Sequence, residues 1–192
     1  MPAEEDAGLI RAAAAGDRRA FGHLVDRHEA AVHRYARSLC RTDAEAEDAL
    51  QQGFLDAWQG AASWRGETSV RGWLFTLTRN AAFRQHRRKV GEPSTLDDLA
   101  ALGEQAGFGS EDPEVLTERA EVQAQVRAAI EALDPVDREV LVLRDIEDLS
   151  AVEAAAILGI EVGALKSRLH RARLKLTARL VALVGGDPCK SA

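Results

Sequence analysis

Apolar residues recur at intervals of three and four along most of this chain, and this periodicity constrains the fold more than any other feature. The clearest case runs from Phe21 to Leu39, where the apolar positions form one stripe on a helix. Ala, Leu, Glu and Arg dominate, with only five prolines, and the sequence has no long run of alternating β-branched residues. Because these residue types lose little conformational freedom in a helix, the sequence predicts an all-α fold.

Helix-start and helix-end signals divide the first half into four expected helices. Gly16 suits the left-handed position at a helix end, and Asp17 can cap the helix that follows. Thr42 and Glu45 have the spacing of a capping box. We expect helices near residues 9–15, 18–39, 43–58 and 70–89, with a loop over 60–69.

A stretch rich in Gly, Ser and acidic residues separates this half from a second helical unit. Asp112-Pro113 and Asp134-Pro135 each place a capping residue before a proline at the first helical position. Ser150 and Glu153 form another capping box, and Gly159 marks a turn. We therefore expect two small helical domains, over 1–90 and 112–184, a flexible acidic linker over 91–111, and a tail over 185–192.

Charge is distributed very unevenly. The net charge of −6 looks wrong for a nucleic-acid binder. However, residues 63–89 hold seven basic residues and one acid, and residues 166–179 hold six and none, so each segment carries +6. Residues 90–118 hold eight acids and no base. Two basic patches on an acidic body indicate contact with a polyanion at two places, and solvated helix faces are the plainer alternative.

Residues 150–176 predict a helix-turn-helix. Three alanines at 154–156 allow two helices to approach closely, and Gly159 allows the turn between them. The inward positions of the second helix are Val162, Leu165, Leu169, Ala172 and Leu176. The outward positions are Lys166, Ser167, His170, Arg171 and Arg173, with Arg168 on the flank. Such a helix can enter the major groove, whereas an ordinary amphipathic hairpin leaves the one-sided charge unexplained.

Both halves resemble one family. Leu133-Asp134-Pro135 and the run from Leu165 to Arg173 resemble the C-terminal DNA-binding domain of extracytoplasmic-function (ECF) sigma factors of the sigma-70 family. The run from Ala46 to Trp58 is similar to their polymerase-binding helix. Trp64-Arg65-Gly66-Glu67 with Arg71-Gly72-Trp73-Leu74 resembles the promoter-melting segment, and 79–88 the adjoining DNA-reading helix. Mild departures occur at Gly53, Glu161 and Ala164.

The resemblance implies a sigma factor that binds core RNA polymerase, directs initiation at promoter DNA in a stress or envelope response, and is held by an anti-sigma factor. It implies polymerase contacts at Asp48, Gln51, Gln52 and Asp56. It implies minus-ten DNA contacts at Trp64, Arg65, Asn80, Arg84, Arg87 and Arg88. It implies contacts of the recognition helix with the minus-thirty-five element at Lys166, Ser167, Arg168, His170, Arg171 and Arg173.

Two of these residues keep a second interpretation. Trp64, in a loop beside Arg65, can stack on an extruded base, but a tryptophan more often packs against its own core. Asn80 can contact a base or be an ordinary polar residue on a helix surface. The charged residues after it are better suited to holding phosphates than to reading bases.

Other features predict no enzyme, no metal site and no cofactor. His23, His28 and His33 are five residues apart, which spreads them around a helix. Cys40 ends an apolar stripe and is expected to be buried, and Cys189 lies in the tail. The acidic N-terminus is unlike a signal peptide, and no apolar run reaches the roughly 20 residues of a membrane span. We expect a cytoplasmic protein with no membrane insertion and no small-molecule substrate.

Two other functions compete with the sigma factor. A stand-alone helix-turn-helix repressor or activator would bind duplex DNA alone, usually as a dimer. It would carry a ligand pocket or dimer helix in its first half, instead of a basic segment beside a tryptophan loop. A helical adaptor that binds only polymerase is the third, and the acid-free second basic segment argues against it.

Overall fold

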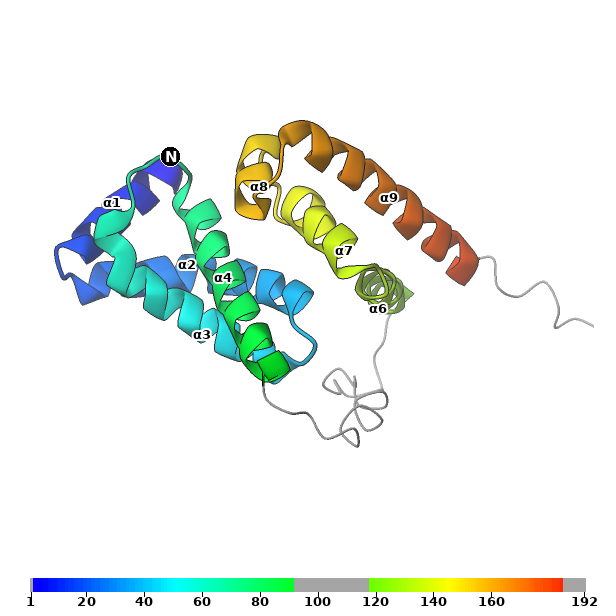
Figure 1. Ribbon diagram of the computed structural model, residues 1–192, viewed down its shortest axis with the longest axis horizontal. Coiled ribbons are helices and arrows are strands. Elements are labelled where there is room, and N and C mark those ends of the chain that lie inside the picture. Colours follow the sequence, from blue (N-terminus) through cyan, green and yellow to red (C-terminus); the bar gives the residue numbers. More distant parts are fainter. Residues whose placement is uncertain (1, 92–117, 185–192) are drawn as a thin grey trace, which may run out of the picture.

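The computed structural model describes residues 2–91 and 118–184, and all regular structure in these ranges is helical, which confirms the all-α prediction. The first unit contains α1 (Pro2–Ala14), α2 (Arg18–Leu39), α3 (Asp43–Gly60), the short 3-10 helix η1 (Ala61–Ser63) and α4 (Val70–Gly91). The second contains α6 (Glu118–Glu131), α7 (Pro135–Leu141), η3 (Val142–Ile146), α8 (Ala151–Leu158) and α9 (Val162–Val184). Figure 1 shows the two units side by side.

Local capping explains where several helices begin and end, although the Asp134 side chain does not cap α7 as the sequence predicted. The Asp17 carboxylate accepts hydrogen bonds from the backbone N–H groups of Arg19 and Ala20 at the start of α2. Gly16 and Gly159 have φ values of +94° and +66°, a region that favours glycine. The first helix begins at Pro2, earlier than the sequence predicted. This extra length packs the first turns of α1 against α2.

The core of the first unit is the predicted apolar stripe of α2 packed against α3 and α4. Leu24, Tyr35 and Phe75 are fully buried, and the rings of Tyr35 and Phe75 lie 4.9 Å apart. Gly53 lies where α3 meets α4, and a Cβ there would lie 2.5 Å from Thr78 Oγ1. The close approach of these two helices therefore requires a glycine.

The second unit departs from expectation between α7 and α8. A helix starts after Asp134 as predicted, but its α-helical part, α7, ends at Leu141 and a π-helical turn, η3, follows. Its last bond joins the Glu147 N–H to the Val142 carbonyl at 2.9 Å, and Asp148 has a positive φ of +49°. Val122 of α6 is 57% exposed.

The two units share one apolar cluster. It joins residues of α1 to α4, such as Leu74, to residues of the second unit, such as Leu143 and Leu149. Helix α2 contacts α7, and α4 contacts α8. The sequence predicted two domains but gave no indication that they would pack together.

Several sequence-based predictions lie outside the described residues. They are the linker beyond Gly91, the helix start at Asp112-Pro113, the tail over 185–192 and Cys189. Arg88 lies in α4, but its side chain is outside the described part. Cys40 ends α2 and is half-buried against Ala residues of α2 and α3, instead of fully buried.

We predict that His28 makes the stability of the first unit depend on pH. Burial lowers the pKa of His28 below its ordinary value, and Arg71 and Arg27 act in the same direction, although Asp6 Oδ2 lies 2.9 Å from its Nε2. The unfolded state therefore binds a proton more readily, so stability is present above about pH 6.5 and falls as the pH drops through the folded pKa. Urea unfolding between pH 7.5 and 5 should show a smaller loss in His28→Gln than in the wild type. An equal loss in both proteins would contradict this assignment.

Candidate functional site

The helix-turn-helix forms as predicted. In α8, Ser150 Oγ accepts from the Glu153 N–H at 3.1 Å, and the Glu153 carboxylate accepts from the Ser150 N–H at 3.1 Å, so the capping box is complete. Ala154 and Ala155 are buried, which allows α8 to pack closely against its neighbours. Gly159 turns the chain, and Leu165, Leu169 and Ala172 bury the inner face of α9.

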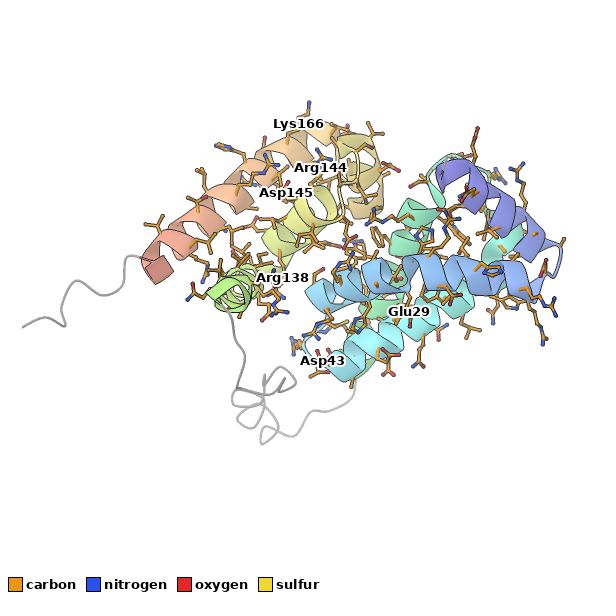
Figure 2. The ribbon with its side chains drawn as sticks, turned by 180° about the vertical axis from the view of Figure 1, so that it is seen from behind. Glu29, Asp43, Arg138, Arg144, Asp145 and Lys166 are labelled. Atoms are coloured by element: carbon orange, nitrogen blue, oxygen red, sulfur yellow. The ribbon has the colours of Figure 1, made fainter. Side chains whose placement is uncertain are left out.

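The outer face of α9 is left open. Lys166, Ser167, His170 and Arg171 are exposed and Arg168 is half-buried. Figure 2 shows Lys166 at the outer edge of the second unit. These side chains share the N-terminal half of one helix, which is the part that enters the major groove in a helix-turn-helix.

Arg173 differs from its neighbours because it already has a partner. Its guanidinium donates to both oxygens of Asp145 in η3, at 2.9 and 2.6 Å. This hydrogen bond, reinforced by the charge of Asp145, raises the pKa of Arg173. The residue therefore ties α9 to the π-helical turn, a role that the sequence did not indicate.

The exposed face of α3 carries the residues that the sequence assigned to polymerase. Asp48, Gln51 and Gln52 are exposed. Gln51 donates to Glu47 at 3.0 Å, and Gln52 donates to Asp56 at 2.7 Å, so hydrogen bonds within the helix orient both amides. Asp56 is less exposed than the others, and its second oxygen accepts from Arg84 of α4.

The Asp56–Arg84 pair joins the predicted polymerase surface to the predicted DNA surface. Asp56 was assigned to polymerase and Arg84 to DNA, yet their side chains meet between α3 and α4. Their side chains are 22% and 47% exposed, so the pair is accessible to solvent and contributes modestly to stability.

The loop before α4 places Trp64 partly inside the protein. Trp64 is half-buried and packs against the apolar cluster, and its buried indole Nε1 has no hydrogen-bond partner in the described structure. In this conformation Trp64 therefore packs against the core, which is one of the two interpretations that the sequence left open. Arg65 beside it is exposed, as are Asn80 and Arg87 on α4.

Sequence reasoning missed a set of ion pairs between the two units. Glu147, after η3, accepts from Arg34 of α2 at 2.9 Å and from Arg71 of α4. Glu139 of α7 accepts from Arg79 of α4 at 2.7 Å and from the Tyr35 hydroxyl at 2.9 Å. The partners are 60 to 113 residues apart in the chain, so no local spacing could have indicated them.

Within 2–91 and 118–184, the His, Cys, Asp and Glu side chains form no group of three that could hold a metal ion. In the same two ranges, no helix is both long and apolar enough to cross a bilayer.

Comparison with known proteins identifies the family. Residues 24–92 match Sigma-70 region 2, and residues 123–176 match Sigma-70, region 4. The chain is 36% identical to the RNA polymerase sigma factor CnrH of Cupriavidus metallidurans, over 93% of this chain and 96% of that one. It is also 36% identical to the ECF RNA polymerase sigma factor SigM of Mycobacterium tuberculosis, over 92% of this chain and 84% of that one.

Solved structures agree with this match. The structure of CnrH in complex with the cytosolic domain of CnrY has a TM-score of 0.67 at 32% identity, covering 93% of this chain and 98% of that one. The sigma factor RpoE in complex with the anti-sigma factor NepR from Bartonella quintana also has a TM-score of 0.67, at 26% identity, covering 83% and 96%.

Two helical units of this order, with a helix-turn-helix in the second, define a transcription initiation factor of the sigma-70 type. The chain belongs to the sigma-70 family, among its ECF RNA polymerase sigma factors. Its function is to programme core RNA polymerase for initiation at particular promoters, which is the work of an initiation factor rather than of an enzyme.

Proposed function

We propose that the two units of this sigma factor divide promoter recognition between them. The domain over 1–90 binds core polymerase and recognises and melts the minus-ten element, and the domain over 112–184 reads the minus-thirty-five duplex. The observation that carries the proposal is the separation of two basic surfaces, one on the loop and α4 and one on α9. A stand-alone repressor needs only the second of these.

The recognition helix reads the upstream element through the exposed start of α9. Lys166, Ser167, His170 and Arg171 are free to meet base edges and phosphates, because the inner face is fully used in packing. Arg168, on the flank, and Arg173, once released from Asp145, add phosphate contacts.

The minus-ten surface consists of the loop and the exposed side of α4. Arg65, Arg84 and Arg87 hold phosphates, with Arg88 continuing the same basic run in the sequence. Asn80 contacts a base, and Trp64 leaves its half-buried position to stack on one during melting. The polymerase surface is the exposed polar face of α3, with Asp56 at its edge beside Arg84.

An anti-sigma factor is the further partner that we propose. Support comes from the sigma factor RpoE, whose solved structure contains an anti-sigma factor, and from CnrH, whose structure contains the cytosolic domain of CnrY. Since the proposed template and polymerase lie in the cytoplasm, we place the protein there, acting in a stress or envelope response.

The division of labour predicts different defects in the two domains. Arg171→Ala should lower run-off transcription mainly from promoters that depend on the upstream element, and should change which upstream bases a promoter library tolerates. A lost base-edge contact costs about 1–3 kcal/mol. Trp64→Ala and Asn80→Ala should instead slow strand opening, measured as permanganate reactivity of unpaired thymines.

Pre-melted templates separate these defects. They should rescue Trp64→Ala and Asn80→Ala and leave Arg171→Ala defective. If a pre-opened bubble rescues Arg171→Ala and not Trp64→Ala, the assignment of the domains is wrong. Nanomolar, sequence-specific binding of duplex promoter by the isolated chain would favour the repressor instead.

A further inference from the structure

Two glutamates of the second unit are buried at its contact with the first. Glu147 is 1% exposed and Glu139 is 6% exposed. A carboxylate removed from water needs charged partners or hydrogen-bond donors, because its desolvation alone costs several kcal/mol. The side-chain hydrogen bonds described for these two carboxylates come from the first unit: from Arg34 and Arg71 to Glu147, and from Tyr35 and Arg79 to Glu139.

Two of these donors belong to the helix that we assign to promoter DNA. Arg71 lies in the first turn of α4, and Arg79 directly precedes Asn80. Each guanidinium also lies over an aromatic ring of the same helix, 5.4 Å from the Phe75 centroid for Arg71 and 4.5 Å from the Phe83 centroid for Arg79. This stacking holds both groups in place for an anion.

A carboxylate and a phosphate bind guanidinium through the same paired N–H donors. While Glu147 binds Arg71 and Glu139 binds Arg79, neither guanidinium is available to a DNA phosphate. A third contact, between the Ser69 hydroxyl and Glu153 Oε1 at 2.6 Å, brings α8 against the start of α4. The outer face of α9 remains exposed in this arrangement.

The backbone on both sides of Glu147 has an unusual conformation, which indicates that the fold holds the Glu147 side chain in a particular place. The π-helical turn η3 ends at Ile146, and Asp148 has a φ of +49°, which costs energy for a residue other than glycine. Such features persist where the surrounding structure requires them. Here they direct the Glu147 side chain, which is fully buried, toward Arg34 and Arg71.

We propose that the free chain rests in a closed, autoinhibited state in which Glu147 occupies Arg71 and Glu139 occupies Arg79 in place of promoter phosphates. Promoter melting requires the two units to separate and release these arginines. The ion pairs themselves favour the closed state only modestly, because the desolvation of buried charges offsets much of their attraction. This inference rests on the proposed role of α4 in DNA binding.

The first test compares Glu139→Gln/Glu147→Gln with the control Glu29→Gln/Glu131→Gln. The control removes two exposed carboxylates, so it has the same net charge. Small-angle X-ray scattering of the free full-length chain should show a larger radius of gyration for the first variant only. Its affinity for a forked minus-ten DNA should rise roughly tenfold over the control, because the binding-competent fraction grows. Its affinity for a minus-thirty-five duplex should equal that of the control.

A second variant, Arg34→Gln, distinguishes opening of the chain from a simple effect of net charge on DNA binding. Arg34→Gln removes a basic residue, so electrostatics alone predict weaker binding of forked DNA. Loss of its pair with Glu147 instead opens the chain and predicts tighter binding. Circular dichroism should show that each variant keeps its helices.

The possible outcomes separate the two proposals. Scattering unchanged from the wild type in both variants would overturn the closed state, whatever the DNA results. A larger radius of gyration without a gain in forked-DNA affinity would overturn the masking of α4 and would count against its assigned role in DNA binding. Opening together with tighter fork binding supports the inference.

Discussion

Replacing Asp48, Gln51 and Gln52 by alanine is expected to abolish capture of core RNA polymerase. All three side chains are exposed on α3, and hydrogen bonds from Gln51 to Glu47 and from Gln52 to Asp56 hold two of them in place. Truncating a central polar contact costs about 1–2 kcal/mol, and each 1.4 kcal/mol is tenfold in affinity. The triple variant should therefore lose roughly a hundredfold or more in a pull-down titration.

The variant deliberately keeps Asp56, because its carboxylate pairs with Arg84 and its loss would disturb the contact between α3 and α4. The matched control is Asp26→Ala, which removes one exposed acid from α2 as the triple variant removes one from α3. Helicity and melting should stay near wild type in both proteins. Retained capture by the triple variant would place the polymerase contact on another surface.

Gly53→Val is expected to destabilise the first unit strongly. A Cβ at this position would lie 2.5 Å from Thr78 Oγ1 and 3.1 Å from the Thr78 Cα, which belongs to the backbone of α4. Rotation of the Thr78 hydroxyl would relieve its own contact but not the contact with Thr78 Cα. Helices α3 and α4 must therefore separate. Overpacking of this kind costs about 1–3 kcal/mol and more where the backbone has to move. Urea unfolding should report it as a lower midpoint with an unchanged slope.

Gly22→Ala is the control for the change in helix propensity. Gly22 is an exposed position inside α2, and a Cβ there would meet nothing within 4 Å. Alanine at this site should stabilise the protein by about 0.5–1 kcal/mol. If Gly53→Val unfolds at the wild-type urea concentration, the helices are not in the tight contact described above.

Local signals made much of this structure predictable from sequence. Asp17 caps α2, and Ser150 with Glu153 begins α8, because a cap depends only on residues within one helical turn. The inner and outer faces of α9 were also predicted, because burial follows the helical period. These elements carry the family resemblance and hence most of the candidate site.

Interactions between distant segments were not predictable in this way. Glu147 and Arg71 are 76 residues apart, and neither has a neighbour in sequence that indicates the pairing. The resemblance implied a DNA contact for Arg173, but its ion pair with Asp145, 28 residues earlier, had no local signal in the sequence. The π-helical turn that presents Asp145 and Glu147 also lacks a local signal, since the helical pattern continues through it.

The bond between Ser69 and Glu153 determines what happens to the secondary structure when the two units part. Ser69 Oγ accepts from the Gly72 N–H at 3.1 Å, and Glu153 Oε2 accepts from the Ser150 N–H, so each residue caps its own helix independently of the other. At this contact, separation replaces one hydrogen bond with bonds to water and leaves both helix starts intact. Neither helix start therefore has to unwind when the bond between Ser69 and Glu153 breaks.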